Sequence, residues 1–133
     1  MIIPKEVKEL FKKVKYMAFS TSNKKGKPNV VAIGSQKIVK DNRIWIIDTY
    51  FDKTKKNILE NNQVAIALWE TSSNGYQIKG KAFYHEDGDV FEEAKNWILK
   101  IKPNKKVKGV VEIYIEEIYS IAAIPKEAGK RLI

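Results

Sequence analysis

The stretch of residues 30–62 constrains the fold most, because it predicts two buried strands that lead directly into a helix. It begins with an apolar strand and turns at the polar residues 40–42. The second strand, residues 43–49, is rich in bulky and branched side chains, which favour buried β structure. Polar and cationic residues then crowd around the start of a short helix, predicted at residues 53–61.

The start of this helix is the first candidate binding site, and it carries Thr49, Lys53, Thr54 and Lys55. The first turn of a helix leaves backbone N–H groups unpaired and bears a partial positive charge, so added hydroxyl and ammonium groups suit a phosphate. Alternatively, Asp52 or Thr54 merely caps a helix whose exposed face carries lysines. The residues alone leave both interpretations open.

The composition indicates a single globular domain without thiol chemistry. The chain has 133 residues, 44% of them hydrophobic and 31% charged, which is enough for a proper core. The absence of cysteine excludes disulfides and thiolate metal sites, and the single His85 disfavours a transition-metal site. No apolar run approaches the ~20 residues of a membrane span, and the N-terminus lacks the order of a signal peptide. We therefore expect a cytoplasmic protein with one domain over residues 1–133, no metal and no membrane contact.

The net charge of +9 would suit a nucleic-acid partner if the lysines lay on one face with aromatic residues between them. Instead the lysines spread along the whole chain, and acidic residues sit among most of them. This pattern favours a solvated surface and no nucleic-acid partner. A few of the cations are still free to face an anionic ligand.

Hydrophobic periodicity predicts six strands and three helices. An amphipathic helix spans residues 4–15, with apolar residues spaced i, i+3, i+4 and i+7. Gly80 falls within a long strand, where it marks a bulge or the close approach of another group. Strands joined mostly by tight turns indicate a mainly β antiparallel barrel with helical caps. The other elements are predicted as strands 16–22, 29–39, 43–49, 63–70, 76–86 and 107–122, helices 53–61 and about 90–101, and an irregular tail at 125–133.

Familiar catalytic fingerprints are absent, since the chain has no dinucleotide-binding, Walker or H-E-x-x-H pattern. His85 beside Glu86 and Asp87 would allow a catalytic pair, but a solvated strand end is the favoured interpretation. The three tryptophans are expected in the core, with one indole beside a planar ligand as the alternative.

Three segments carry a resemblance to a known family: PNVVAIGSQKI, IWIIDTYFDKTKKNILENNQVAIALW and YQIKGKA. Their order resembles that of the pyridoxamine 5′-phosphate oxidase-like FMN-binding split-barrel family over about residues 7–122, and it is most similar to the small, largely uncharacterised flavoproteins of that family. The resemblance implies a six-stranded antiparallel split barrel of Greek-key type, with an N-terminal helix, a short helix at the phosphate site and a longer helix before the last strand.

The resemblance also implies which residues hold FMN. In the family, the strand before the bend lays its backbone along the isoalloxazine ring. The end of the next strand and the following helix start hold the ribityl chain and the phosphate, and a glutamine at the entry to a later strand often lies near the flavin. Matched residue by residue, the expected cofactor-binding set is Val31, Ala32, Ile33, Gly34, Ser35, Gln36, Asp48, Thr49, Lys53, Thr54, Lys55 and Gln77.

The substrate site of the true oxidases is not matched. Those enzymes place arginines on the FMN phosphate and on the phosphate of their substrate, whereas this chain has only Arg43 and Arg131. We therefore expect an FMN-binding redox protein or oxidoreductase with an unknown electron donor and acceptor, and no pyridoxamine phosphate oxidase activity. The alternatives are a non-enzymatic flavin store, a deazaflavin-dependent reductase and a basic nucleic-acid-binding module.

The resemblance further implies a two-fold homodimer, with the flavin at the subunit interface and closed over by the partner. The residues agree, because Trp45, Trp69, Trp97 and Phe51 offer more large apolar surface than a small barrel readily buries. An interface of about 1,600 Å² or more in total would absorb this surface.

Overall fold

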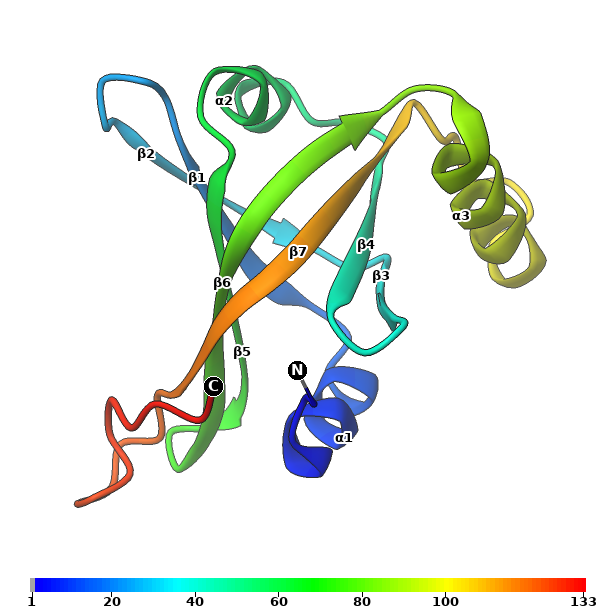
Figure 1. The fold of residues 1–133 in the computed structure, drawn as a ribbon. Helices are drawn as coiled ribbons and strands as arrows, with labels where there is room; N and C mark the ends of the chain where they lie inside the picture. Colours follow the sequence, from blue (N-terminus) through cyan, green and yellow to red (C-terminus); the bar gives the residue numbers. More distant parts are fainter. Residues whose placement is uncertain (1) are drawn as a thin grey trace.

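The computed structural model describes residues 2–133 and has three helices and seven strands (Figure 1). Most element boundaries lie within a few residues of the predicted ones. None of the helices it describes is both long and apolar enough to cross a bilayer. In chain order the elements are α1 (Lys5–Lys13), β1 (Met17–Ser22), β2 (Pro28–Ile33), β3 (Gln36–Val39), β4 (Arg43–Asp48), α2 (Lys53–Glu60), β5 (Gln63–Thr71), β6 (Asn74–His85), α3 (Gly88–Ile101) and β7 (Gly109–Ser120).

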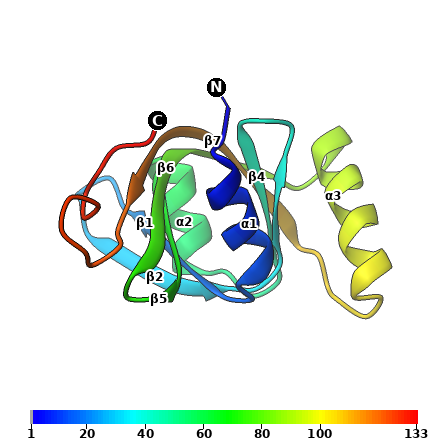
Figure 2. The same cartoon turned by 90° about the horizontal axis from the view of Figure 1, so that it is seen from below.

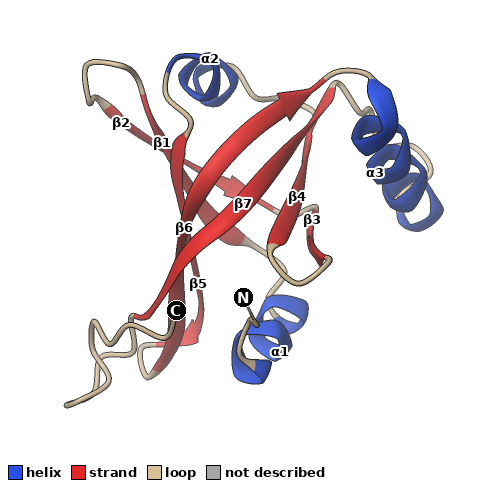
Figure 3. Cartoon of the chain, viewed as in Figure 1, coloured by secondary structure: helices blue, strands red, loops and turns tan. Residues whose placement is uncertain are grey.

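All seven strands join in one antiparallel sheet with the order β2-β1-β5-β6-β7-β4-β3. The sheet curls strongly, and the helices lie at its open ends and on one outer side (Figures 1 and 3). The mainly β class, the antiparallel split barrel and the three capping helices are confirmed.

The strand count differs from the prediction by one, because the strand expected at residues 29–39 is broken at Gly34 and Ser35. Before the break β2 pairs with β1, and after it β3 pairs with β4, so two successive strands occupy opposite ends of the sheet order. The Ser35 carbonyl accepts a hydrogen bond from the Ile47 N–H at 3.0 Å, which ties the break to β4. At this break the chain crosses from one end of the sheet to the other, and it thereby closes one side of the barrel.

Gly80 marks a bulge in β6, as the sequence predicted. The register between β6 and β7 shifts between Lys79 and Gly80. A Cβ atom at Gly80 would overlap the backbone carbonyl of Tyr114, so the two strands approach each other too closely for any larger residue. A bulge bends its strand and increases the local twist, which helps this sheet to curl.

The apolar side chains form two clusters, and β4 contributes to both. Ile44 and Ile46 lie in the cluster that fills the barrel, whereas Trp45 and Ile47 lie in the cluster beneath α3. Successive side chains of a strand point to opposite faces, so a strand covered on both sides is apolar throughout. This double burial explains the continuous apolar run of residues 44–47.

Helix α1 covers the opening of the barrel (Figure 2). Its apolar stripe, Val7, Leu10 and Phe11, is buried in the first cluster, as the helical spacing predicted. Helix α3 buries Phe91, Ala94 and Ile98 in the second cluster. Ile101 is 61% exposed, because it is the last residue of the helix and lies beyond this cluster.

The three tryptophans occupy different environments rather than sharing the core. Trp45 is buried, and Trp97 is half-buried against the second cluster. Trp69 is 51% exposed, because it lies on the outer face of β5, on the side opposite to the buried Leu68.

Candidate functional site

A cavity of about 380 Å³ lies where β2 breaks into β3. One wall is the end of β2 and the break itself, residues 31–35. A second wall is the connection from β4 to α2, with Thr49, Tyr50 and Phe51. The structure therefore brings residues 31–35 and Thr49 of the predicted cofactor set together in one cavity.

Three lysines outside the predicted cofactor set also line the cavity: Lys15, Lys102 and Lys105. The Lys102 ammonium donates to Ser35 Oγ at 2.8 Å and to the Gly34 carbonyl at 3.2 Å, which holds the segment after α3 against the break. Burial, and then the positive charge of Lys102, lowers the pKa of Lys105. An anionic group in the cavity would relieve this repulsion. Lys15 is far from Lys102 and Lys105 in the sequence, and all three are far from residues 31–51, so no local pattern could reveal that they share this cavity.

Asp48 lies behind the cavity rather than in its lining. Its side chain is fully buried, and Oδ1 accepts a hydrogen bond from the Phe51 N–H at 2.8 Å, while Oδ2 accepts one from the Tyr84 hydroxyl. Burial raises the pKa of Tyr84, and the hydrogen bond to Asp48 raises it further. Asp48 thereby fixes the connection that forms the second wall. A direct contact of Asp48 with a flavin stays a prediction.

The start of α2 offers unpaired backbone donors. Within residues 2–133, the backbone N–H groups of Lys53, Thr54 and Lys55 make no hydrogen bond. Asp52 occupies the N-cap position, but its side chain makes no capping hydrogen bond. The buried Thr54 hydroxyl accepts a hydrogen bond from Asn29 Nδ2 at 3.1 Å. The structure thus does not show the capping arrangement, and it leaves three donors at the positive end of a helix free for an anion.

The two lysine side chains of this segment differ in their surroundings. Lys53 is exposed and forms no ion pair with any described residue. Lys55 is half-buried, with its Nζ 2.5 Å from Glu86 Oε1 and 4.7 Å from the centroid of the Tyr84 ring. A phosphate at the start of α2 would therefore compete with Glu86 for Lys55.

The two glutamines of the predicted set lie outside the cavity. Gln36 lines a neighbouring cavity between α1 and β3, and its Nε2 donates to the Lys15 carbonyl at 3.2 Å. Gln77 is the last residue of a row that begins in the cavity wall, in which each residue pairs directly with the next across neighbouring strands. Residues paired in this way share one face of a sheet. It therefore faces the same side as the cavity wall but lies three strand spacings, roughly 14 Å, away. The row consists of Ala32, Ala18, Ala67 and Gln77.

Exposed apolar side chains border the cavity. Tyr16, Val30 and Trp69 are 63%, 64% and 51% exposed, and they surround a shallow hollow of about 280 Å³ whose floor includes Ala18 and Ala32. Contiguous exposed apolar surface of this kind marks interaction sites in many proteins.

His85 contacts neither Glu86 nor Asp87 through a hydrogen bond in the part of the chain that the structure describes. Its Nε2 lies 3.1 Å from Oε1 of Glu112, a buried residue of β7. The other oxygen of Glu112 lies 3.6 Å from Nη1 of Arg43. These partners come from three strands, so only the sheet register brings them together.

Comparisons with known proteins agree with this fold. The family model described as pyridoxamine 5′-phosphate oxidase matches residues 3–122. The uncharacterized protein MJ0282 of Methanocaldococcus jannaschii is 37% identical over 126 residues, which cover 93% of this chain and 83% of that protein.

Solved structures share the same architecture. HupZ of Group A Streptococcus has a TM-score of 0.85 and 25% identity, over 99% of this chain and 100% of that one. An FMN-binding protein from Syntrophomonas wolfei subsp. wolfei has a TM-score of 0.73 and 18% identity, over 85% of this chain and 82% of that one. The family match over nearly the whole chain and the 37% identity lead to one conclusion: this chain belongs to the pyridoxamine 5′-phosphate oxidase family.

Proposed function

We propose that this protein binds FMN, with the isoalloxazine ring against residues 31–35 and the phosphate at the start of α2. The observation that carries the proposal is the set of unpaired backbone N–H groups at Lys53, Thr54 and Lys55, which follow directly on the cavity wall formed by Thr49 and Phe51. Family membership and the shared fold of an FMN-binding protein support it. When bound, the flavin would supply the redox chemistry, and the protein would bind and orient it.

The lysines of the cavity would place positive charge beside the cofactor. Lys15, Lys102 and Lys105 line the same space, and no carboxylate lines it within residues 2–133. Positive charge stabilises an anionic group through Coulomb attraction, and this attraction is stronger in a partly desolvated cavity than in water. These residues would therefore favour the more negatively charged state of whatever group they face.

A redox role with a substrate other than pyridoxamine phosphate fits this site better. The oxidases that this chain resembles place arginines on the phosphate of their substrate, and the two arginines of this chain are engaged elsewhere. Arg43 Nη1 lies 3.6 Å from Glu112 Oε2, and Arg131 Nη1 lies 3.6 Å from Glu117 Oε1. Neither arginine lines the cavity. Oxidation of NADH or NADPH by the flavin-loaded protein, followed by absorbance, would distinguish an enzyme from a flavin store.

The protein would act as a two-fold homodimer. The exposed Tyr16, Val30 and Trp69 adjoin the cavity, so a second copy packed on this surface would cover their apolar area and would also enclose the cofactor. A stable interface buries about 1,600 Å² in total. Light scattering of the flavin-loaded protein at micromolar concentration tests this, and a monomeric mass would refute it.

The phosphate assignment is tested by comparing FMN with riboflavin, which lacks the phosphate. Lys53→Ala and Lys55→Ala should each weaken the binding of FMN far more than the binding of riboflavin. Loss of one charge-assisted hydrogen bond should cost roughly 1.5–3 kcal/mol, or about one to two decades in affinity. Titration of the apoprotein, followed by quenching of flavin fluorescence, measures both ligands.

Two control variants separate this effect from general surface charge. Lys24→Ala removes an exposed cation from the β1–β2 turn and should leave both affinities unchanged. Glu86→Gln removes the carboxylate that pairs with Lys55, so it should leave FMN binding intact or strengthen it. If Lys53→Ala and Lys55→Ala weaken riboflavin and FMN equally, the phosphate does not lie at α2. If neither flavin binds and a reduced deazaflavin does, the cofactor assignment is wrong.

A further inference from the structure

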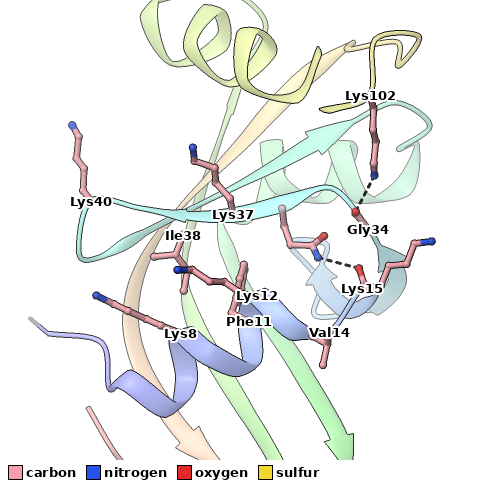
Figure 4. A pocket seen from close by; sticks show the side chains of 11 residues that line it. Lys8, Phe11, Lys12, Val14, Lys15, Gly34, Lys37, Ile38, Lys40 and Lys102 are labelled. Atoms are coloured by element: carbon pink, nitrogen blue, oxygen red, sulfur yellow. Dashed lines mark hydrogen bonds between the residues drawn. The ribbon is translucent and has the colours of Figure 1, made fainter. Parts of the chain in front are cut away.

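A second cavity, of about 670 Å³, lies between α1 and β3 (Figure 4). It is separate from the proposed ring cavity but shares Lys15, Gly34 and Lys102 with it. Figure 4 shows Lys8 and Lys12 on α1, below the strand that carries Lys37. Six lysines line this cavity: Lys8, Lys12, Lys15, Lys37, Lys40 and Lys102. The Lys37 ammonium, however, lies over the rings of Trp45 and Trp97, on the side of β3 away from α1.

The positive charge of this cavity is largely uncompensated. Among residues 2–133, no aspartate or glutamate lines it. Lys8 has only a distant partner, the exposed Asp41, at 3.8 Å. Lys12, Lys15 and Lys40 form no ion pair with any residue that the structure describes. Like charges around one cavity repel one another, and an anion bound among them would replace repulsion with attraction.

The floor of the cavity is apolar and includes one unsatisfied polar atom. Phe11, Val14 and Ile38 line it, and Phe11 is buried. Oε1 of Gln36 is buried and has no hydrogen-bond partner, while its Nε2 donates to the Lys15 carbonyl. A buried acceptor without a partner is costly, so a ligand hydroxyl or amine that donates to Oε1 would be favourable. A ligand for this cavity thus has an apolar or ring portion as well as anionic groups.

The shape of the cavity decides between a small molecule and a polymer. Its volume lies within the roughly 300–1,000 Å³ of small-molecule sites. Apart from Lys37, the lysines come from α1 and the segment after it, from the β3–β4 turn and from the end of α3, so they lie around a hollow rather than form the extended stripe that follows a nucleic-acid backbone. We infer that this cavity binds a small molecule with two or more phosphate or carboxylate groups and an apolar or ring portion.

Lys15 and Lys102 line both cavities, so the test uses lysines that line only this one and lie outside the proposed FMN site. ATP serves as the probe, since it has a triphosphate, sugar hydroxyls and a ring. In calorimetric titration at fixed ionic strength, ATP should bind with a stoichiometry of one per chain and more tightly than tripolyphosphate. Lys12→Gln and Lys40→Gln should each weaken ATP about three- to tenfold, as expected for one lost charge contact.

Matched controls locate the binding. Lys5→Gln removes a lysine of the same helix that does not line the cavity, and Lys53→Ala removes the cation proposed to meet the FMN phosphate. Neither should change ATP affinity by more than about twofold, within the ordinary effect of a remote surface charge. Lys12 and Lys40 are exposed, so both variants should fold, and thermal melting without ligand should show an unchanged or higher Tm.

Three results would overturn the inference. Equal losses of ATP affinity in the Lys5→Gln and Lys12→Gln variants would mean that diffuse surface charge, and not this cavity, attracts ATP. A loss with Lys53→Ala alone would place ATP at α2 instead. Tight binding of a single-stranded RNA oligonucleotide, weakened by the same cavity variants while ATP binds weakly, would identify a nucleic-acid surface. Failure of ATP binding would leave the FMN-versus-riboflavin comparison unaffected, so the two proposals fail separately.

Discussion

Tyr84→Phe tests whether the buried carboxylate of Asp48 organises the wall of the proposed flavin cavity. The substitution removes one hydroxyl and leaves Oδ2 of a fully buried Asp48 without its donor, while Oδ1 still accepts from the Phe51 N–H. A hydrogen bond to a charged group contributes about 1.5–3 kcal/mol, and an unsatisfied buried acceptor costs a similar amount. We therefore expect the free energy of unfolding to fall by about 1.5–3 kcal/mol, a large part of a typical domain's stability.

Urea denaturation followed by tryptophan fluorescence measures this loss. Tyr119→Phe is the matched control, because the Tyr119 hydroxyl also donates to a carboxylate, that of Glu117, but at the surface. This control should change stability very little. Equal losses in the two variants would refute the role of Asp48. Because Phe51 lines the cavity, Tyr84→Phe should also weaken FMN binding, whereas Tyr119→Phe should not.

The same hydroxyl predicts how stability depends on alkaline pH. The pKa of Tyr84 is raised above the ordinary value of 10.0 in the folded protein, first by burial and then by Asp48. Above pH 10 the unfolded chain releases this proton while the folded protein keeps it, so stability falls as pH rises, by at most about 1.4 kcal/mol per pH unit. The stability difference between the wild type and Tyr84→Phe should therefore narrow above pH 10. A constant difference from pH 8 to pH 11 would contradict this reasoning.

Three further predictions concern the sheet, the dimer and the cavity. Gly80→Ala should lower the free energy of unfolding in urea by at least about 2 kcal/mol, because the added Cβ overlaps the Tyr114 carbonyl; an unchanged midpoint would show that β6 and β7 can separate there. Trp69→Ser should shift the protein toward monomer in light scattering with unchanged circular dichroism, and a dimer of unchanged stability would place the interface elsewhere. Lys102→Gln should weaken FMN binding about tenfold, because one charge contact in the cavity is lost. Lys100→Gln changes an exposed lysine outside the cavity and should leave FMN affinity unchanged, so equal effects of the two variants would show a general charge effect.

Local patterns in the sequence were sufficient for most of the secondary structure. The apolar run in β4, the helical spacing of Val7, Leu10 and Phe11, and the bulge at Gly80 all follow from the properties of neighbouring residues. Strand alternation and helix periodicity are short-range signals, so they can be recognised without knowing which strands or helices pack against each other. The family resemblance correctly extended these signals to a split barrel.

The candidate site was only partly accessible from the sequence. Residues 31–35 and Thr49 were expected near one another, and they do line one cavity. Gln36 and Gln77 were expected there too, but the first lies beyond the break in the strand and the second lies several strands away on the same face. Residue matching to a family gives positions along the chain, whereas a cavity is defined by which positions meet across it.

The sequence by itself determined the class of fold and the order of most of its elements, because both follow from patterns among residues within a few positions of one another, but it left the capping of α2 open. The tertiary structure decided three other features: the break at Gly34, the partnership of His85 with Glu112, and the gathering of lysines around two adjoining cavities. Each of these depends on how far the sheet curls and on the register between distant strands. Curvature and register are set by the packing of the whole chain, so no short segment contains them.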